Sequence, residues 1–94
     1  MAQSTGPDFW DATWAGGWEN GEGTQIIIAG GAVIGFYWDE AYPEVRHSAL
    51  SADGNAISFT WQSGTAVLTR AADGVEAIIR EDGRPDRTIA LTRD

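Results

Sequence analysis

Short runs in which apolar and polar residues alternate follow one another along most of this chain. In the clearest run, Ile57, Phe59 and Trp61 alternate with Ser58 and Thr60. A period of two places successive side chains on opposite faces of a β-strand. The pattern therefore predicts strands with one buried face, and no run is long and periodic enough to predict an internal helix.

Turn signals separate these runs at nearly constant spacing in the second half of the chain. They are Asp53-Gly54, Ser63-Gly64, Asp73-Gly74 and Asp82-Gly83. Such pairs are typical of tight hairpin connections, which force consecutive strands to be antiparallel. We expect eight strands, at residues 15–20, 24–29, 32–39, 45–51, 56–61, 65–71, 75–80 and 87–93.

A short helical turn is expected before the first strand. Pro7 suits the first position of a helix, and Trp10 and Trp14, four residues apart, would share one face of that turn. Residues 1–7 are small and polar, and we expect them to be disordered. Residues 8–94 are then predicted to form a single β-barrel domain.

Eight sequential strands favour an antiparallel up-and-down (meander) barrel over an open sheet. Closure removes the exposed strand edges that promote aggregation. A barrel with this number of strands has room inside for side chains or for one small ligand. Because the predicted strands are short, any cavity is expected to be small.

The segment from Val33 to Trp38 is the exception to one-sided patterning. Val33 and Tyr37 are expected on one face, and the other face carries Ile34, Phe36 and Trp38. A strand that is apolar on both faces is covered on both faces. Since exposed aromatic patches usually mark interfaces, we expect this second face to form a homo-oligomeric contact, in a dimer or tetramer. Cover by the N-terminal aromatic segment of the same chain is the alternative.

The composition excludes several classes of function. Fourteen acidic against six basic residues give a formal net charge of −8, whereas nucleic acids and anionic membranes need a positive partner surface. The chain has no cysteine and one histidine, His47, so thiolate chemistry and multi-histidine metal sites are excluded. No acid/base pair, nucleophile motif or metal cluster is recognisable. We therefore expect neither enzyme activity nor a cofactor or metal.

No targeting or membrane-spanning segment is recognisable in the sequence. The longest apolar stretch, residues 26–38, is interrupted by three glycines and is too short to span a bilayer. The N-terminus lacks the basic start and apolar core of a signal peptide. We expect a cytoplasmic protein, or a secreted or periplasmic one whose signal has been removed.

Three stretches carry a recognisable motif. Gly16-Gly17-Trp18 is a Gly-x-Trp sequence, and residues 18–28 followed by residues 33–37 read Trp, Asn two residues on, Gly-Thr, an apolar run, then Gly-x-Tyr. These resemble the first strands of the calycin barrels, and most closely those of the avidin and streptavidin family. Ile57–Trp61 is similar to the mid-barrel strand that supplies a tryptophan wall in that family. The resemblance covers residues 16–38 and 57–64 and implies a streptavidin- or lipocalin-like barrel.

The resemblance also implies a site. In that family the Asn, the Ser/Thr hydroxyl and the Tyr hydroxyl bind the ureido oxygen of biotin, and the matching positions here are Asn20, Thr24 and Tyr37. Trp61 matches the tryptophan wall. The implied function is a non-catalytic module that holds a small ligand inside the barrel through these four residues. From the residues alone, Asn20 and Thr24 are also interpreted as organising the turn between them, and Trp61 as core.

An alternative function does not involve a small ligand. The chain would then be a structural or protein-interaction domain with a filled core. It would assemble through the apolar outer face of the third strand, formed by Ile34, Phe36 and Trp38.

Overall fold

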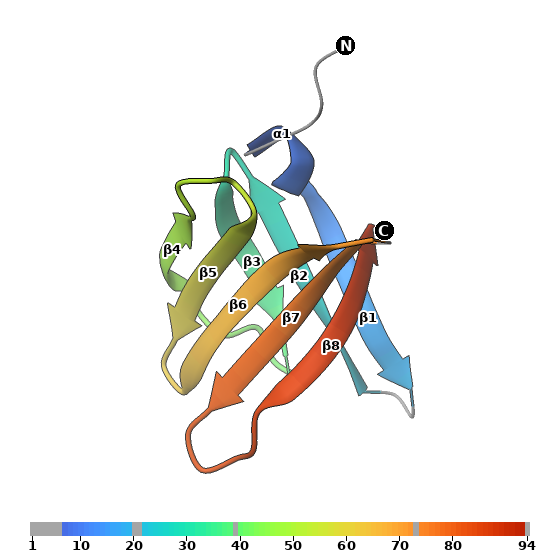
Figure 1. Ribbon diagram of the computed structural model, residues 1–94. Coiled ribbons are helices and arrows are strands. Elements are labelled where there is room, and N and C mark those ends of the chain that lie inside the picture. Colours follow the sequence, from blue (N-terminus) through green and yellow to red (C-terminus); the bar gives the residue numbers. More distant parts are fainter. Residues whose placement is uncertain (1–6, 20–21, 39, 73, 94) are drawn as a thin grey trace.

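The computed structural model describes residues 7–19, 22–38, 40–72 and 74–93 (Figure 1). Strands make up most of the described chain, which confirms the predicted all-β class. The elements are α1 (Pro7–Trp10), β1 (Ala12–Glu19), β2 (Glu22–Ala29), β3 (Ala32–Tyr37), β4 (Arg46–Leu50), β5 (Ala56–Trp61), β6 (Gly64–Ala71), β7 (Gly74–Glu81) and β8 (Arg87–Arg93). The helical turn and the strands lie where the sequence predicts them, within a few residues at their ends.

The strands form one antiparallel meander sheet. Their order is β3-β2-β1-β8-β7-β6-β5-β4, so β1 pairs with β8, and β3 and β4 are the two edges. The sheet curls until these edges approach each other, which gives the predicted barrel in a nearly closed form (Figure 1). We call the β3–β4 junction the seam. The Val33 N–H donates to Ser48 Oγ across the seam at 2.8 Å.

The β1–β8 pairing includes a close backbone approach at Gly16. A Cβ atom at this position would lie 2.1 Å from the carbonyl oxygen of Ala90, so a larger residue cannot fit without moving β8. Trp14 pairs with Arg93 in the same ladder. Glycine is therefore required here for packing, which gives the first residue of the Gly-x-Trp motif a structural role.

A β-bulge in β3 changes which of its residues face the interior. Ile27 pairs with Gly35 but Ile28 pairs with Val33, so Ile34 is an extra residue opposite the β2 ladder. A single inserted residue moves every side chain after it to the opposite face. Strict alternation through this strand is therefore wrong.

The bulge overturns the predicted outer face of Ile34, Phe36 and Trp38. Phe36 and Trp38 are 2% and 5% exposed and belong to the core, whereas Ile34 is 65% exposed. Tyr37 lies between the two buried aromatic residues and faces outward, beside Gln25 of β2. The described part of β3 therefore presents no continuous apolar outer face.

The interior of the barrel is packed with side chains that alternate along the strands. β5 contributes Ile57, Phe59 and Trp61, as predicted. The buried apolar residues are Trp10, Trp14, Ile26, Ile28, Val33, Phe36, Trp38, Ile57, Phe59, Trp61, Ala66, Leu68, Val75, Ala77, Ile79, Ile89 and Leu91. Thr24 is the buried polar residue of the described chain. The core therefore occupies the interior along the described strands.

The helical turn α1 closes one end of the barrel, which we call the capped end. Trp10 is fully buried there, and its indole N–H donates to the carbonyl of Gly54 in the β4–β5 loop at 2.9 Å. The indole N–H of Trp14 donates to the carbonyl of Trp10, also at 2.9 Å. Both indole donors are thus satisfied by backbone carbonyls, as buried donors require.

Two arginines cover the outside of this cap. The guanidinium of Arg70 lies over the ring of Phe9, 4.1 Å from its centroid, and that of Arg93 lies over Phe9 and Trp14 at 5.5 and 5.3 Å. Arg93 also donates to the carbonyl of Phe9. These cation–π contacts tie α1 to β6 and β8.

The β4–β5 loop that receives Trp10 is organised by Asp53. Its Oδ1 accepts from the Ser51 hydroxyl at 2.6 Å and from the Asn55 N–H at 3.0 Å. These two hydrogen bonds, that of Ser51 first, lower the pKa of the Asp53 carboxyl below 3.8 because they favour its charged form. The loop therefore holds Gly54 in place by local polar contacts.

Candidate functional site

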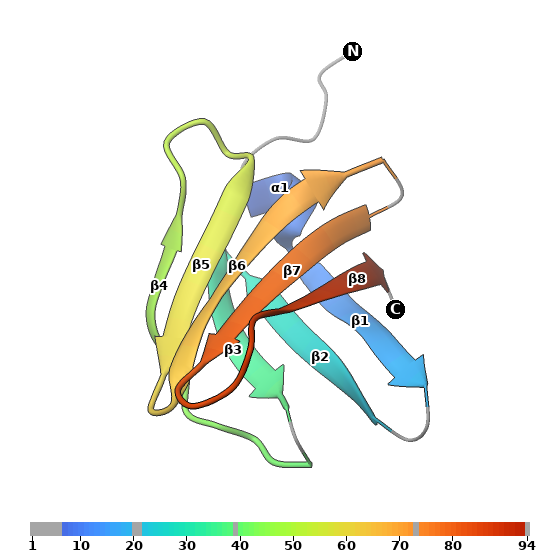
Figure 2. The same ribbon diagram turned by 60° about the horizontal axis from the view of Figure 1, so that its bottom comes forward.

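The opposite end of the barrel, which we call the mouth, carries a pocket of about 310 Å³. The mouth is formed by the connections at residues 40–45, 62–63 and 82–86, at the bottom of Figure 1 and turned forward in Figure 2. Its lining residues are Trp38, Ala41, Pro43, Glu44, Arg46, Trp61, Gln62, Ser63 and Glu81. The pocket thus combines two buried tryptophans with three charged side chains.

Aromatic rings form the inner wall of this pocket. Trp38 is stacked on Phe36 with centroids 6.2 Å apart and planes 10° apart, and Trp61 lies 4.9 Å from Phe36. Trp61 also lies 5.8 Å from Phe59. Because these rings hold one another in place, the tryptophan edges at the pocket are fixed before any ligand arrives.

Glu81, at the end of β7, brings a carboxylate to the same pocket. Its side chain is only 13% exposed. Oε2 accepts a long hydrogen bond of 3.4 Å from the indole N–H of Trp38. Oε1 lies 3.2 Å from Nη1 of Arg84, an ion-pair distance, yet it is buried and accepts no hydrogen bond from the described residues. The mouth therefore contains a shielded acceptor whose hydrogen-bonding capacity is not used.

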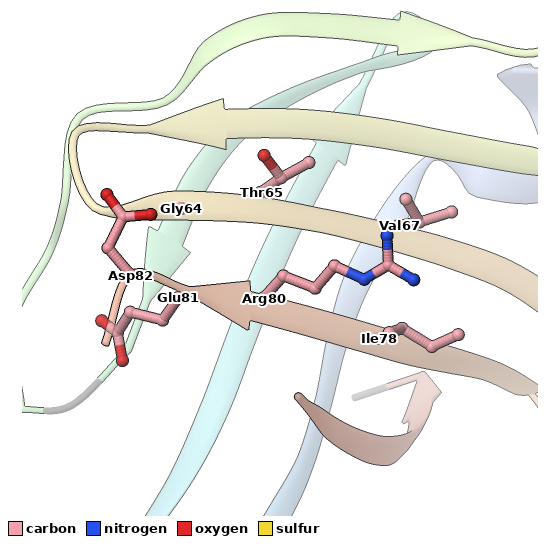
Figure 3. A pocket seen from close by; sticks show the side chains of 7 residues that line it. All are labelled: Gly64, Thr65, Val67, Ile78, Arg80, Glu81 and Asp82. Atoms are coloured by element: carbon pink, nitrogen blue, oxygen red, sulfur yellow. The ribbon is translucent and has the colours of Figure 1, made fainter. Parts of the chain in front are cut away.

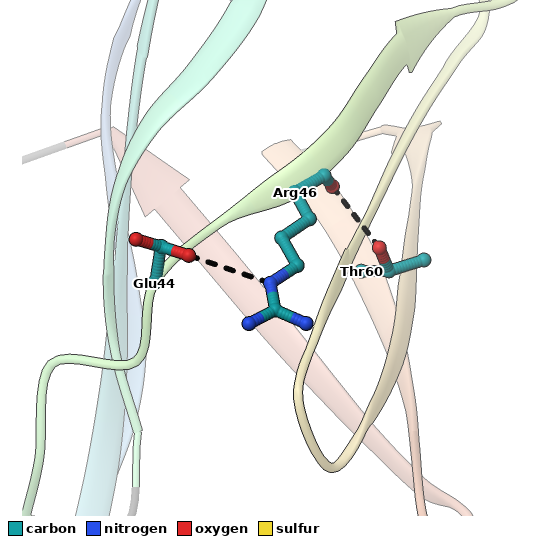
Figure 4. A network of polar contacts seen from close by, with 3 residues as sticks. All are labelled: Glu44, Arg46 and Thr60. Atoms are coloured by element: carbon teal, nitrogen blue, oxygen red, sulfur yellow. Dashed lines mark hydrogen bonds and ion pairs between the residues drawn. The ribbon is translucent and has the colours of Figure 1, made fainter.

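The rim of the pocket is held by a second, exposed ion pair. Glu44 Oε1 lies 3.4 Å from Nε of Arg46, and the carbonyl of Arg46 accepts from the Thr60 hydroxyl at 3.2 Å (Figure 4). The side chains of Glu44 and Arg46 are 80% and 51% exposed. The guanidinium of Arg87 lies 5.2 Å from the ring centroid of Trp38.

The structure places two of the four predicted ligand-binding residues inside the barrel. Trp61 is 6% exposed and lines the mouth pocket. Thr24 is fully buried, and its hydroxyl donates to the carbonyl of Tyr37 at 2.7 Å. That hydrogen bond uses the hydroxyl proton of Thr24 to fasten β2 to β3.

Tyr37 does not join them. The ring of Tyr37 faces outward and lies 5.0 Å from the ring of Tyr42 in the β3–β4 connection. Asn20 lies outside the described residues. Thr24, Tyr37 and Trp61 therefore do not converge as three side chains on one ligand atom.

Sequence reasoning missed Glu81 as a site residue, although a signal was present. Glu81 shares the parity of Val75, Ala77 and Ile79, which all face the interior. Extending the strand by one residue beyond Arg80 would have placed the carboxylate on the inner side. Trp38 was assigned to an interface because the bulge before it cannot be recognised from alternation.

A second pocket, of about 420 Å³, lies on the outer face of β6 and β7. Its lining residues are Gly64, Thr65, Val67, Ile78, Arg80, Glu81 and Asp82 (Figure 3). Arg80 extends along this face, where its side chain is 70% exposed and pairs with Asp86 at 3.2 Å. Although larger, this hollow has no buried tryptophan in its lining, so the mouth pocket is the stronger candidate.

In the described part of the chain, no group of three or more His, Asp or Glu side chains is placed to hold a metal ion. No described helix has the length and apolar character needed to cross a membrane. His47 is exposed at the bulge of β4, with φ of 49°.

Comparisons with protein-family models, with curated proteins and with solved structures found no match to this chain. An eight-stranded meander barrel does not by itself assign a chain to the avidin and streptavidin family. The mouth pocket is therefore the feature of the described chain that bears most directly on function.

Proposed function

We propose that this protein is a non-catalytic binding module that takes a small ligand at the mouth of its barrel. The observation that carries the proposal is the buried Oε1 atom of Glu81, which accepts no hydrogen bond from the described residues. Glu81 lines the mouth pocket together with Trp38 and Trp61. A donor on the ligand would satisfy this oxygen.

The energetics favour such a use of Glu81. Leaving a buried acceptor without a hydrogen bond costs about 1–3 kcal/mol. The ion pair with Arg84 offsets part of this cost, and a ligand that supplies a hydrogen-bond donor recovers the remainder. The pocket volume of about 310 Å³ lies at the small end of the range for ligand sites. A compact ligand with one flat or apolar part against the tryptophans fits these dimensions.

The proposal places the ligand nearer the surface than the sequence resemblance implies. The interior is occupied by the aromatic and aliphatic core, and the hydroxyl of Thr24 already donates to the carbonyl of Tyr37. Of the described residues expected to bind the ligand inside the barrel, Trp61 is the one that also lines the mouth.

Native mass spectrometry tests the proposal. The purified protein is incubated with a small-molecule extract of its source organism, and its mass is measured before and after denaturation. We expect a non-covalent adduct that is lost on denaturation and that Glu81→Ala abolishes. The matched control is Glu76→Ala, which removes an exposed carboxylate from the same strand and should keep the adduct. Absence of an adduct on the wild type, or its retention by Glu81→Ala, would refute the proposal.

A further inference from the structure

Charged side chains at the mouth fall into two kinds. Glu44 and Arg46 are an exposed pair, and such surface pairs contribute little free energy. Glu81 is different, because its side chain is 13% exposed while its partner Arg84 is 53% exposed. A shielded carboxylate is therefore paired with a cation that lies largely in solvent.

Arg84 satisfies Glu81 incompletely. It follows Glu81 by three residues in the β7–β8 connection, and its Nη1 reaches ion-pair distance of Oε1 without giving that atom a hydrogen bond. A cation that approached the carboxylate from the pocket side could form a charge-assisted hydrogen bond, which is about twice as strong as a neutral one.

The neighbouring indole also accepts cations. The guanidinium of Arg87 lies over the Trp38 ring at 5.2 Å, a contact that the electron-rich face of the ring favours. Trp38 at the same time donates to Oε2 of Glu81. The carboxylate and the indole thus form one continuous surface on which two of the chain's own guanidinium groups already lie.

The charge of the ligand follows from this arrangement. A neutral ligand that displaced Arg84 would leave the shielded charge of Glu81 without a counter-charge, which is costly. A positively charged ligand would replace the counter-charge. The acidic chain, with a formal net charge of −8, also attracts cations over a longer range.

We infer that the ligand carries a cationic hydrogen-bonding head group, an amine or a guanidinium, which replaces Arg84 on Glu81 and lies against Trp38. This inference rests on the proposed function and adds the chemical class of the ligand. It also assigns Arg84 a role as an internal competitor. Arg84 competes with the ligand for Glu81 and thereby lowers the affinity of the site.

A titration with two probes of the same shape tests the inference. Butylguanidinium carries the charge, and butylurea is its neutral counterpart. Binding is followed through the indole N–H signals of Trp38 and Trp61 in the NMR spectrum of ¹⁵N-labelled protein. The signal of Trp10, at the capped end, reports whether each variant is folded. We expect butylguanidinium to bind at least roughly tenfold more tightly than butylurea, as a charge-assisted bond implies.

Two arginine variants separate competition from general electrostatics. Arg84→Ala and Arg80→Ala remove the same charge, but Arg80 pairs with Asp86 on the outer face. We expect Arg84→Ala to bind butylguanidinium roughly two- to fivefold more tightly than Arg80→Ala does, the range that an exposed ion pair supports. Glu81→Gln should abolish the preference for the charged probe.

The outcomes distinguish the inference from the proposed function. Equal binding of the two probes at Trp38 and Trp61 would overturn the cationic class while leaving a small-ligand site at the mouth. Equal effects of Arg84→Ala and Arg80→Ala would overturn the competitor role. If neither probe shifts these signals in any variant, the inference is wrong, and the proposed function is decided by the adduct experiment alone.

Discussion

Both ends of this barrel contain buried tryptophans, but the indole N–H groups have different hydrogen-bond acceptors at the two ends. At the capped end, Trp10 and Trp14 each donate to a backbone carbonyl at 2.9 Å. At the mouth, Trp38 donates to the carboxylate of Glu81 at 3.4 Å, and the second oxygen of that carboxylate accepts no hydrogen bond from the described residues.

Because of this difference, we expect the capped end to contribute to stability and the mouth to contribute to ligand binding. Polar groups that are fully satisfied within the chain add to stability and offer nothing to a ligand. A shielded group that is only partly satisfied gives a ligand something to gain. The residue type does not decide between these roles; the neighbouring groups do.

The largest effect is expected at the capped end. Trp10→Ala removes a fully buried side chain and should lower the free energy of unfolding by about 3–5 kcal/mol, as for other large-to-small core changes. Urea denaturation followed by circular dichroism measures it. A loss below about 1 kcal/mol would mean that the cap is not part of the stable structure.

A substitution at the seam should lower the free energy of unfolding by a smaller amount. Ser48→Ala removes the acceptor of the Val33 N–H, one of the contacts that join β3 to β4. We expect the free energy of unfolding to fall by about 1–2 kcal/mol, since the amide loses its partner. Ser58→Ala on β5 is the control and should change stability by less than about 0.5 kcal/mol. If the free energy of unfolding falls equally in the two variants, the hydrogen bond across the seam makes no specific contribution to stability.

At the mouth, we expect a substitution to affect ligand binding more than stability. Glu81→Gln removes a partly desolvated charge, so the lost ion pair is offset by a smaller desolvation cost. The free energy of unfolding should change by less than about 1 kcal/mol, while binding of butylguanidinium is lost. A destabilisation comparable to that of Trp10→Ala would show that Glu81 is a structural residue.

The outer surface of β3 should contribute little to stability or to self-association. Ile34, 65% exposed at the bulge, is what remains exposed of the predicted interface. We expect Ile34→Ser to change stability by less than about 0.5 kcal/mol and to leave the mass in solution unchanged by light scattering. A drop in mass would support assembly through this strand.

The smallest effect concerns the loop that receives the Trp10 indole. The pKa of Asp53 is lowered by its hydrogen bonds to Ser51 and Asn55. Its contribution to stability is therefore present above pH 3.8 and is lost as the pH falls through the lower folded-state pKa. Between about pH 5 and pH 3, the urea midpoint of the wild type should fall more than that of Asp53→Asn. Equal falls would contradict this assignment.

The fold could be predicted from the sequence because its signals are local. Alternation and glycine-containing turns determine the strands one hairpin at a time, and the inward positions of Ile57, Phe59 and Trp61 follow directly. The bulge at Ile34 could not be predicted, because it arises from the pairing of β3 with β2. That one residue moved Trp38 from a predicted interface to the mouth.

The candidate site was only partly predictable for the same reason. The inward position of Trp61 could be predicted because Trp61 continues a regular strand. Glu81 continues the inward parity of β7, but its meeting with Trp38 depends on the curvature of the whole sheet. Tyr37 matched a family motif by sequence, yet the bulge turns its side chain outward.

The most direct test of the division between the two ends is a single NMR titration of the ¹⁵N-labelled wild type with butylguanidinium. We predict that the indole N–H signals of Trp38 and Trp61 shift while those of Trp10 and Trp14 stay in place. Shifts of Trp10 and Trp14 that equal or exceed those at the mouth would contradict the account.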